Sequence, residues 1–210
     1  MHRTVEDVMT DVMSSPVVTV GPGMPVKEVA ALLVRHSISA VPVVDAAGTL
    51  LGIVSEADLV PLQAVPESRG RFQRFDELLR YLPRTAADAM TRDVVTLPED
   101  ADVAQAALLM LERAVKRIPV VRDGRATGIV SRRDLLRALA RSDAEVRAEV
   151  EDLLNEEQLQ LGGVDVSVAG GIVSLAGLAG AGGRRAAEIL ARSVPGVVAV
   201  TFADRPVSTR

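Results

Sequence analysis

Apolar and polar residues follow one pattern along the chain, and that pattern occurs twice. In each copy a short apolar stretch comes first, at 17–20 and again at 94–97, and we predict that it forms a strand. A stretch follows in which apolar residues recur every three or four positions, so that they share one helical face. These positions are Val26, Val29, Ala30 and Leu33 in the first copy and Val103, Ala106, Ala107 and Met110 in the second. The spacing predicts one amphipathic helix per copy.

Two more strands and a closing helix complete each copy. The strands are expected at 41–44 and 50–54, and again at 118–121 and 126–130, and the closing helices start at Ser55 and Ser131. The second pair of strands is joined by Asp123-Gly124, which favours a two-residue hairpin because both residues tolerate positive φ. Each copy is therefore predicted to be a β-α-β-β-α unit.

Short motifs recur in the same order in both copies, which indicates an internal duplication. The recurring pairs are Met9-Thr10 and Met90-Thr91, Val41-Pro42-Val43-Val44 and Ile118-Pro119-Val120-Val121, Gly52-Ile53-Val54-Ser55 and Gly128-Ile129-Val130-Ser131, and Asp58-Leu59 and Asp134-Leu135. The stretch between the copies contains Pro66, Gly70 and Pro83 and is predicted to be a linker, in which 75–81 either forms a short helix or stays solvated.

The pattern changes after about residue 142. A charged amphipathic helix is predicted over 144–161, a hairpin over 164–175 with Gly170-Gly171 at its turn, a helix over 184–193 and a last strand over 197–202. The glycine-rich stretch 177–184 is expected to be a flexible connection, since it lacks the ending of a phosphate-binding P-loop. We predict repeats at 1–64 and 87–142, a linker at 65–86, a small α+β domain at 143–205 and a tail at 206–210.

Composition and charge exclude several functions. The net charge is -4 and only 2% of the residues are aromatic, so neither a basic field nor stacking platforms are available for nucleic acid. The chain has no cysteine, which removes disulfides and thiolate chemistry. The first residues lack the apolar stretch of a signal peptide, and we predict a cytoplasmic protein. No constellation of nucleophile, base and metal ligands is visible, so we expect no enzyme activity and no required cofactor.

The repeats resemble the CBS domain, and two copies resemble the usual CBS pair (Bateman module). The resemblance covers about residues 4–142 and depends on the Met-Thr, Pro-Val-Val and Gly-Ile-Val-Ser-x-x-Asp-Leu motifs. The tail resembles a BON domain through Val166-x-Val168-x-x-Gly171-x-Val173-x-Leu175-x-Gly177 and Val194-Pro195-Gly196-Val197. The resemblance implies an α+β fold with two pseudo-symmetric β-α-β-β-α repeats and an αββαβ domain. It also implies a homodimer formed through the CBS pair.

Each closing helix starts with Ser-x-x-Asp, at Ser55 and Asp58 and again at Ser131 and Asp134. One interpretation is a capping box, in which serine and aspartate satisfy the free backbone groups of the first turn. The other is a ligand site, because a helix start attracts phosphate and polar ligand atoms. The CBS resemblance implies that both aspartates bind ribose hydroxyls of an adenine nucleotide, with both serines nearby. It also implies that the base lies against Ala40, Val41 and Pro42 or Arg117, Ile118 and Pro119.

The two copies differ in charge around this motif. The second has Lys116, Arg117, Arg132 and Arg133 where the first has Ser39, Ala40, Glu56 and Ala57. If these cations converge on one cleft, that cleft prefers charged phosphates; otherwise they form a solvated helix face. Thr19 and Thr96, on the first predicted strands, complete the candidate ligand-binding residues.

Two functions follow from these expectations. The first is a sensor that binds AMP, ADP, ATP or a related adenosyl ligand between its repeats and signals through the BON domain to a protein partner. The alternative is an envelope-associated protein that binds phospholipid through the BON domain, with the CBS pair as a dimerisation scaffold. The chain offers no basic amphipathic face and no aromatic anchor for a membrane, so we favour the sensor.

Overall fold

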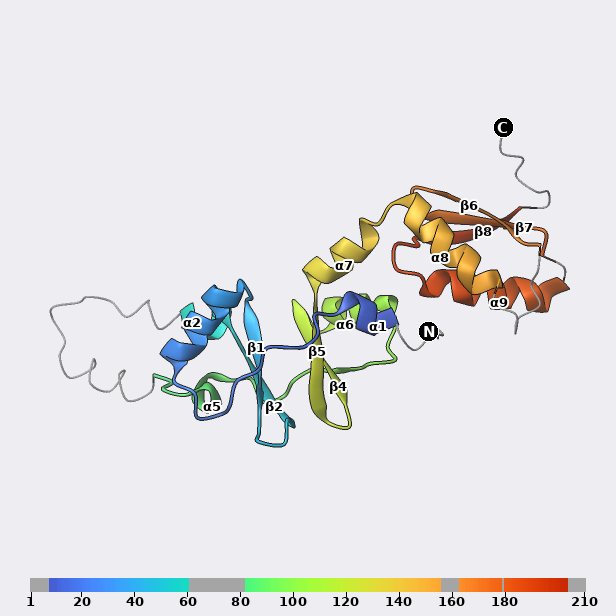
Figure 1. The fold of residues 1–210 in the computed structure, drawn as a ribbon. Coiled ribbons are helices and arrows are strands. Elements are labelled where there is room, and N and C mark those ends of the chain that lie inside the picture. The colour runs from blue at the N-terminus through green and yellow to red at the C-terminus, as the bar shows by residue number, and fades with distance from the viewer. Residues whose placement is uncertain (1–7, 61–81, 156–162, 179, 204–210) are drawn as a thin grey trace. The chain divides into compact units, whose positions relative to one another are not determined.

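The structure is a computed structural model that describes residues 8–60, 82–155, 163–178 and 180–203 (Figure 1). The chain divides into two compact units. One contains the described residues of 15–97 and 118–129, and the other contains those of 1–14, 98–117 and 130–210. The helix considered over 75–81 and the end of the helix predicted to reach residue 161 lie outside the described residues.

The first repeat supplies most of one unit. It contains α2 (Val26–His36), β1 (Ala40–Val44), β2 (Leu50–Ser55) and α3 (Glu56–Leu59). The strands pair antiparallel, with Ala40 opposite Ser55. Val29 and Leu33 of α2 belong to one buried cluster with Val41, Val43 and Val54 of the strands. The helical face and the strand pair predicted from the sequence are confirmed.

The first predicted strand of each repeat is shorter than expected. Over 17–20 only Val20 pairs, through an isolated parallel bridge to Val43, and in the second repeat β3 is limited to Leu97–Pro98. The Val20 N–H donates to the Pro42 carbonyl at 3.0 Å, and the Val44 N–H donates to the Val20 carbonyl at 2.9 Å. A longer ladder would need an N–H at position 42, which proline lacks. Pro119 holds the corresponding position in the second repeat.

The leading segment of the second repeat packs on the first repeat. This segment contains α5 (Ala86–Ala89), and beyond it Thr91 exchanges two backbone hydrogen bonds with Ile53, of 3.0 and 2.9 Å. A Cβ atom on Gly52 would lie 2.6 Å from the Met90 sulfur and 2.8 Å from the Thr91 carbonyl oxygen. The glycine of the Gly-Ile-Val-Ser motif is therefore required by the Met-Thr motif packed against it.

The hairpin turns of the two repeats also meet. Strand β4 (Arg117–Arg122) neighbours β5 (Arg125–Ser131), and the two turn residues between them, Asp123 and Gly124, both have positive φ, as predicted. The Gly124 carbonyl accepts a hydrogen bond from the Leu50 N–H at 3.0 Å, and the Gly48 carbonyl accepts one from Ala126 at 3.3 Å. Backbone hydrogen bonds thus join the two hairpins within this unit.

The other unit begins with three helices, α1 (Val8–Val12), α6 (Val103–Glu112) and α7 (Arg132–Leu139). Helix α1 comes from the start of the chain but contacts α6 and α7 of the second repeat. Ala106 and Met110 are buried on α6, which confirms the helical face predicted there.

The C-terminal domain of this unit is an αββαβ fold. It contains α8 (Asp143–Asn155), β6 (Asp165–Ala169), β7 (Ile172–Ala176), α9 (Gly180–Ser193) and β8 (Ala199–Ala203). Strand β7 pairs antiparallel with β6 and parallel with β8. Both helices pack on one face of this sheet, where Val150 and Ala187 share a core with Val173 (Figure 1).

Helix α9 begins at Gly180 rather than at the predicted residue 184. The expectation of a flexible connection over all of 177–184 was therefore wrong for its second half. Ala187 and Ala191 are buried in the domain core, and such packing stabilises a helix whose glycine-rich first turn has low intrinsic propensity.

The described residues offer neither a membrane-spanning helix nor a cluster of metal ligands. No helix among them is long and apolar enough to cross a bilayer. They also contain no group of three side chains placed to hold a metal ion.

Candidate functional site

The closing helix of the first repeat starts with a capping box. The Ser55 N–H and hydroxyl both donate to Asp58 Oδ2, each at 2.7 Å. Ser55 has extended backbone angles, as an N-cap residue requires. Among the described residues, the other carboxylate oxygen of Asp58 has no hydrogen-bond partner. This aspartate therefore keeps one acceptor oxygen for a further donor.

The same box occurs in the second repeat with an additional partner. The Ser131 N–H and hydroxyl donate to Asp134 Oδ2 at 2.9 and 2.6 Å, and Arg137 Nη1 donates to Asp134 Oδ1 at 3.0 Å. Asp134 is only 8% exposed, and a buried carboxylate needs such donors. The capping interpretation of both motifs is confirmed. The capping bonds do not prevent either carboxylate from accepting a further hydrogen bond from a ligand.

A cavity of about 400 Å³ lies beside Asp134. One wall is the C-terminal end of α7, with Arg137 and Ala138 on the helix and Arg141 beyond it. The segment 11–14 and Pro195 complete the lining. Pockets of about 300–1,000 Å³ suit small ligands, so this cavity is large enough for a mononucleotide.

The cations predicted from the sequence are not those of this cavity. Lys116, Arg132 and Arg133 are exposed and Arg117 is half-buried, and none of the four lines the cavity. Arg132 lies instead on a separate apolar groove. The residues that sequence reasoning missed are Arg137 and Arg141. Arg137 lies three residues after Asp134 on the same helix, a spacing that brings two side chains together and that the sequence does contain. Arg141 lies beyond the end of α7, and the helical spacing does not indicate its position.

The residues expected to hold the base lie beside each helix start. In the first repeat Ala40 lies opposite Ser55, and the Ser39 carbonyl accepts a hydrogen bond from Glu56 at 3.0 Å. In the second, the Lys116 carbonyl accepts one from Arg132 at 3.1 Å.

These residues differ in what they can present to a ligand. Pro42 and Pro119 are buried, and Val41 and Ile118 are completely buried, so these two residues expose neither side chain nor backbone to a ligand. Thr19 is half-buried and Thr96 is exposed.

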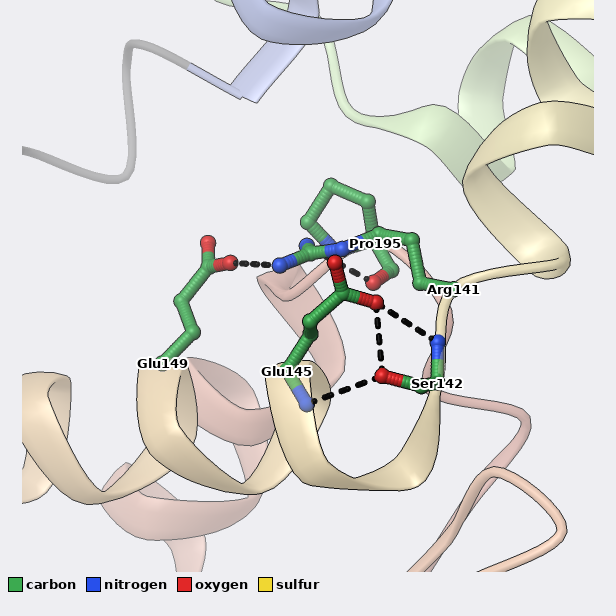
Figure 2. A network of polar contacts seen from close by, with 5 residues as sticks. All are labelled: Arg141, Ser142, Glu145, Glu149 and Pro195. Carbon is green, nitrogen blue, oxygen red and sulfur yellow. Dashed lines mark hydrogen bonds and ion pairs between the residues drawn. The ribbon is translucent and has the colours of Figure 1, made fainter.

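Arg141 also joins the cavity to the C-terminal domain (Figure 2). Its Nη2 forms an ion pair with Glu149 Oε2 at 2.6 Å, and its Nη1 donates to the Pro195 carbonyl at 3.0 Å. Next to it, the Ser142 hydroxyl and N–H donate to Glu145 at 2.7 and 2.9 Å, which caps α8. These hydrogen bonds lower the pKa of Glu145 below its ordinary value.

Comparison with family models identifies these parts. The CBS domain model matches residues 5–64 and 86–141, and the BON domain model matches residues 142–202. The chain is a CBS-domain protein with a C-terminal BON domain. The α+β architecture of a CBS pair followed by an αββαβ BON domain is thereby established.

The relatives of this CBS protein match mainly the paired repeats. The chloroplastic CBS domain-containing protein CBSX2 of Arabidopsis thaliana is 31% identical over 151 residues, which is 64% of this chain and 63% of that protein. A crystal structure of CBSX2 in complex with AMP is 29% identical, with a TM-score of 0.53, and covers 65% of this chain and 96% of that one. The CBS-domain protein ATU1752 from Agrobacterium tumefaciens is 32% identical, with a TM-score of 0.51, and covers 65% and 98%.

Proposed function

We propose that this chain is a non-catalytic regulatory protein whose CBS pair binds an adenine nucleotide: AMP, ADP, ATP or a related adenosyl ligand. The observation that carries the proposal is Asp134, a buried carboxylate at a helix start that opens onto a cavity of about 400 Å³. The fold similarity to CBSX2, whose crystal structure is a complex with AMP, supports the choice of ligand.

Each repeat would use the same residue types on the ligand. Asp58 and Asp134 would accept hydrogen bonds from the ribose hydroxyls, with Ser55 and Ser131 beside them. A carboxylate oxygen commonly accepts more than one hydrogen bond, so the capping bonds need not be broken. The segments 40–42 and 117–119, beside the helix starts, would lie next to the base.

We further propose that the protein is a homodimer that associates through its second-repeat helices. An apolar groove of about 450 Å³ runs along α6 and α7. Two leucines at this groove are largely exposed, Leu111 at 73% and Leu136 at 64%. Large aliphatic side chains exposed together are typical of an interaction surface, and a second copy of the chain would cover them.

The BON domain would transmit the bound state to a protein partner. Its first helix follows α7 after only Ala140, Arg141 and Ser142, and Arg141 bonds to both Glu149 and Pro195. A change at the start of α7 therefore has a short physical route to the BON domain.

A thermal-shift panel tests the nucleotide class. A ligand present at about 100 times its Kd stabilises the folded state by about 2.7 kcal/mol, so AMP, ATP or S-adenosylmethionine should raise the Tm by several degrees. NADH extends the panel, and GMP at equal concentration serves as the control for the base. A Tm unchanged by every adenosyl compound would refute the proposal.

A further inference from the structure

The cavity at Asp134 is lined by both the second CBS repeat and the BON domain. Asp134 and Arg137 come from α7, and Pro195 comes from the BON loop before β8. Arg141 lines the same cavity while its guanidinium group is held by Glu149 and by the Pro195 carbonyl (Figure 2). A ligand in this cavity would thus lie within reach of groups that position the BON domain.

The BON loop packs directly against the end of α7. Gly196 has a φ of 101°, a conformation that favours glycine. A Cβ atom there would lie 2.8 Å from Val146 Cγ2 and 3.2 Å from the Ala138 carbonyl oxygen. This close contact and the hydrogen bond from Arg141 to the Pro195 carbonyl connect the loop to the end of α7.

Each guanidinium group of the cavity is paired with a carboxylate. Arg137 pairs with Asp134 at 3.0 Å, and Arg141 pairs with Glu149 at 2.6 Å. The Glu149 side chain is only 11% exposed, so little solvent screens this pair. A phosphate that enters the cavity meets guanidinium groups, which bind phosphate as well as carboxylate in bidentate geometry. A phosphate that takes the Nη2 hydrogens of Arg141 competes with Glu149 for them.

We propose that the 5′-phosphate of the nucleotide bound at Asp134 competes with Glu149 for Arg141, and that nucleotide binding thereby loosens the BON loop from α7. This inference rests on the proposed function. It adds that the ligand carries a phosphate, and that the Arg141–Glu149 pair couples the CBS repeat to the BON domain. Because coupling is reciprocal, weakening the Arg141–Glu149 pair strengthens binding of the phosphate.

Calorimetric titration of the full chain with AMP and with adenosine tests this competition. Glu149→Gln keeps a hydrogen-bond acceptor for Arg141 but removes the competing charge. We expect it to bind AMP roughly tenfold more tightly, the effect of about one charge-assisted hydrogen bond, and adenosine unchanged. Glu151→Gln is the matched control, since it removes the same charge from the same helix, where its partner is Arg147.

The outcomes separate this inference from the proposed function. If AMP does not bind the wild-type chain, the proposed function fails and this inference with it. If AMP binds and Asp134→Asn weakens it, but Glu149→Gln behaves like Glu151→Gln, only the inference is overturned. An equal gain for adenosine overturns it too, because adenosine has no phosphate.

Two further measurements keep the test decisive if Glu149→Gln folds poorly. Arg141→Lys keeps the charge without the forked geometry, and we expect it to weaken AMP binding and not adenosine binding. In the wild-type chain, AMP should accelerate hydrogen exchange of the Val198 N–H, which donates to the Gly171 carbonyl beside the docked loop. Equal exchange with AMP and with adenosine would contradict the proposal.

Discussion

Arg137 donates a hydrogen bond to Asp134 from the next turn of the same helix, at 3.0 Å. The first repeat has no such arginine, because the residue that follows Asp58 by three positions is Pro61. The two aspartates of the duplicated motif therefore differ before any ligand binds. Asp58 offers an acceptor oxygen directly, whereas a ribose at Asp134 has to share the carboxylate with a guanidinium group.

Replacing Arg137 should change which ligand the Asp134 site prefers. Arg137→Gln removes a competitor for the ribose and, at the same time, a cation for the phosphate. We expect the preference for AMP over adenosine to fall by about tenfold, the effect of one charge-assisted hydrogen bond. Calorimetry with both ligands measures this ratio. Arg192→Gln, which removes a similar ion pair on α9, should leave the ratio unchanged, and an unchanged ratio in Arg137→Gln would exclude a phosphate contact there.

Gly52→Ala should destabilise the CBS pair. The added methyl group would meet the Met90 side chain and the Thr91 carbonyl oxygen, both within 2.8 Å, and such overpacking costs about 1–3 kcal/mol. Urea denaturation measures the free energy of unfolding. Gly23→Ala is the matched control, because nothing lies within 4 Å of a Cβ atom at that position. Equal stability of the two variants would mean that the Met-Thr segment does not pack on β2.

The sequence predicted what depends on local chemistry. The helical faces, the Asp123-Gly124 turn and both Ser-Asp caps follow from spacing and from residues adjacent in the chain, and all are confirmed. The duplicated motifs also predicted the fold, because four pairs that recur in the same order identified the repeat.

What the sequence could not supply depends on contacts between distant residues. Nothing in the repeat pattern indicated that Thr91 pairs with Ile53 of the other copy, or that Arg141 reaches Pro195, 54 residues away. The predicted length of the first strand in each repeat was wrong for a different reason. Their composition suits a strand, but the partner strand has a proline where the ladder needs a donor.

The cap of α8 should make stability depend on pH. The pKa of Glu145 is lowered from its ordinary value of 4.5 because the Ser142 hydroxyl and N–H donate to its carboxylate. A lowered folded-state pKa means that the cap stabilises the fold fully above the ordinary value and is lost as the pH falls through the folded-state pKa. The stability difference between the wild type and Glu145→Ala should therefore be constant near neutral pH and shrink in acid.

Chemical denaturation at a series of pH values measures this difference. Glu112→Ala, at the exposed end of α6, gives the baseline for loss of a glutamate outside a cap. A Glu145→Ala difference that stays the same at the most acidic pH at which the protein folds would show that the carboxylate does not cap α8.

Charge placed on the groove of α6 and α7 should separate the dimer. Leu136→Glu puts an unpaired carboxylate on a surface that a second copy would bury, and an uncompensated buried charge is strongly unfavourable. Sedimentation should give twice the chain mass for the wild type and the chain mass for this variant. Ile189→Glu, at an exposed position on α9, should sediment like the wild type, and a Leu136→Glu protein that stays dimeric would place the interface elsewhere.

Calorimetric titration with AMP tests the central claim most directly, applied to the wild type and to Asp58→Asn, Asp134→Asn and Asp88→Asn. Asp88 caps α5 through the same box geometry, with Thr85 as its partner, so its variant isolates the effect of losing a capping carboxylate. We predict that the wild type and Asp88→Asn bind AMP alike, that each of the other two variants loses binding at one site, and that their combination abolishes it. AMP binding that persists in the double variant, or is absent from the wild type, would contradict a nucleotide sensor built on these two aspartates.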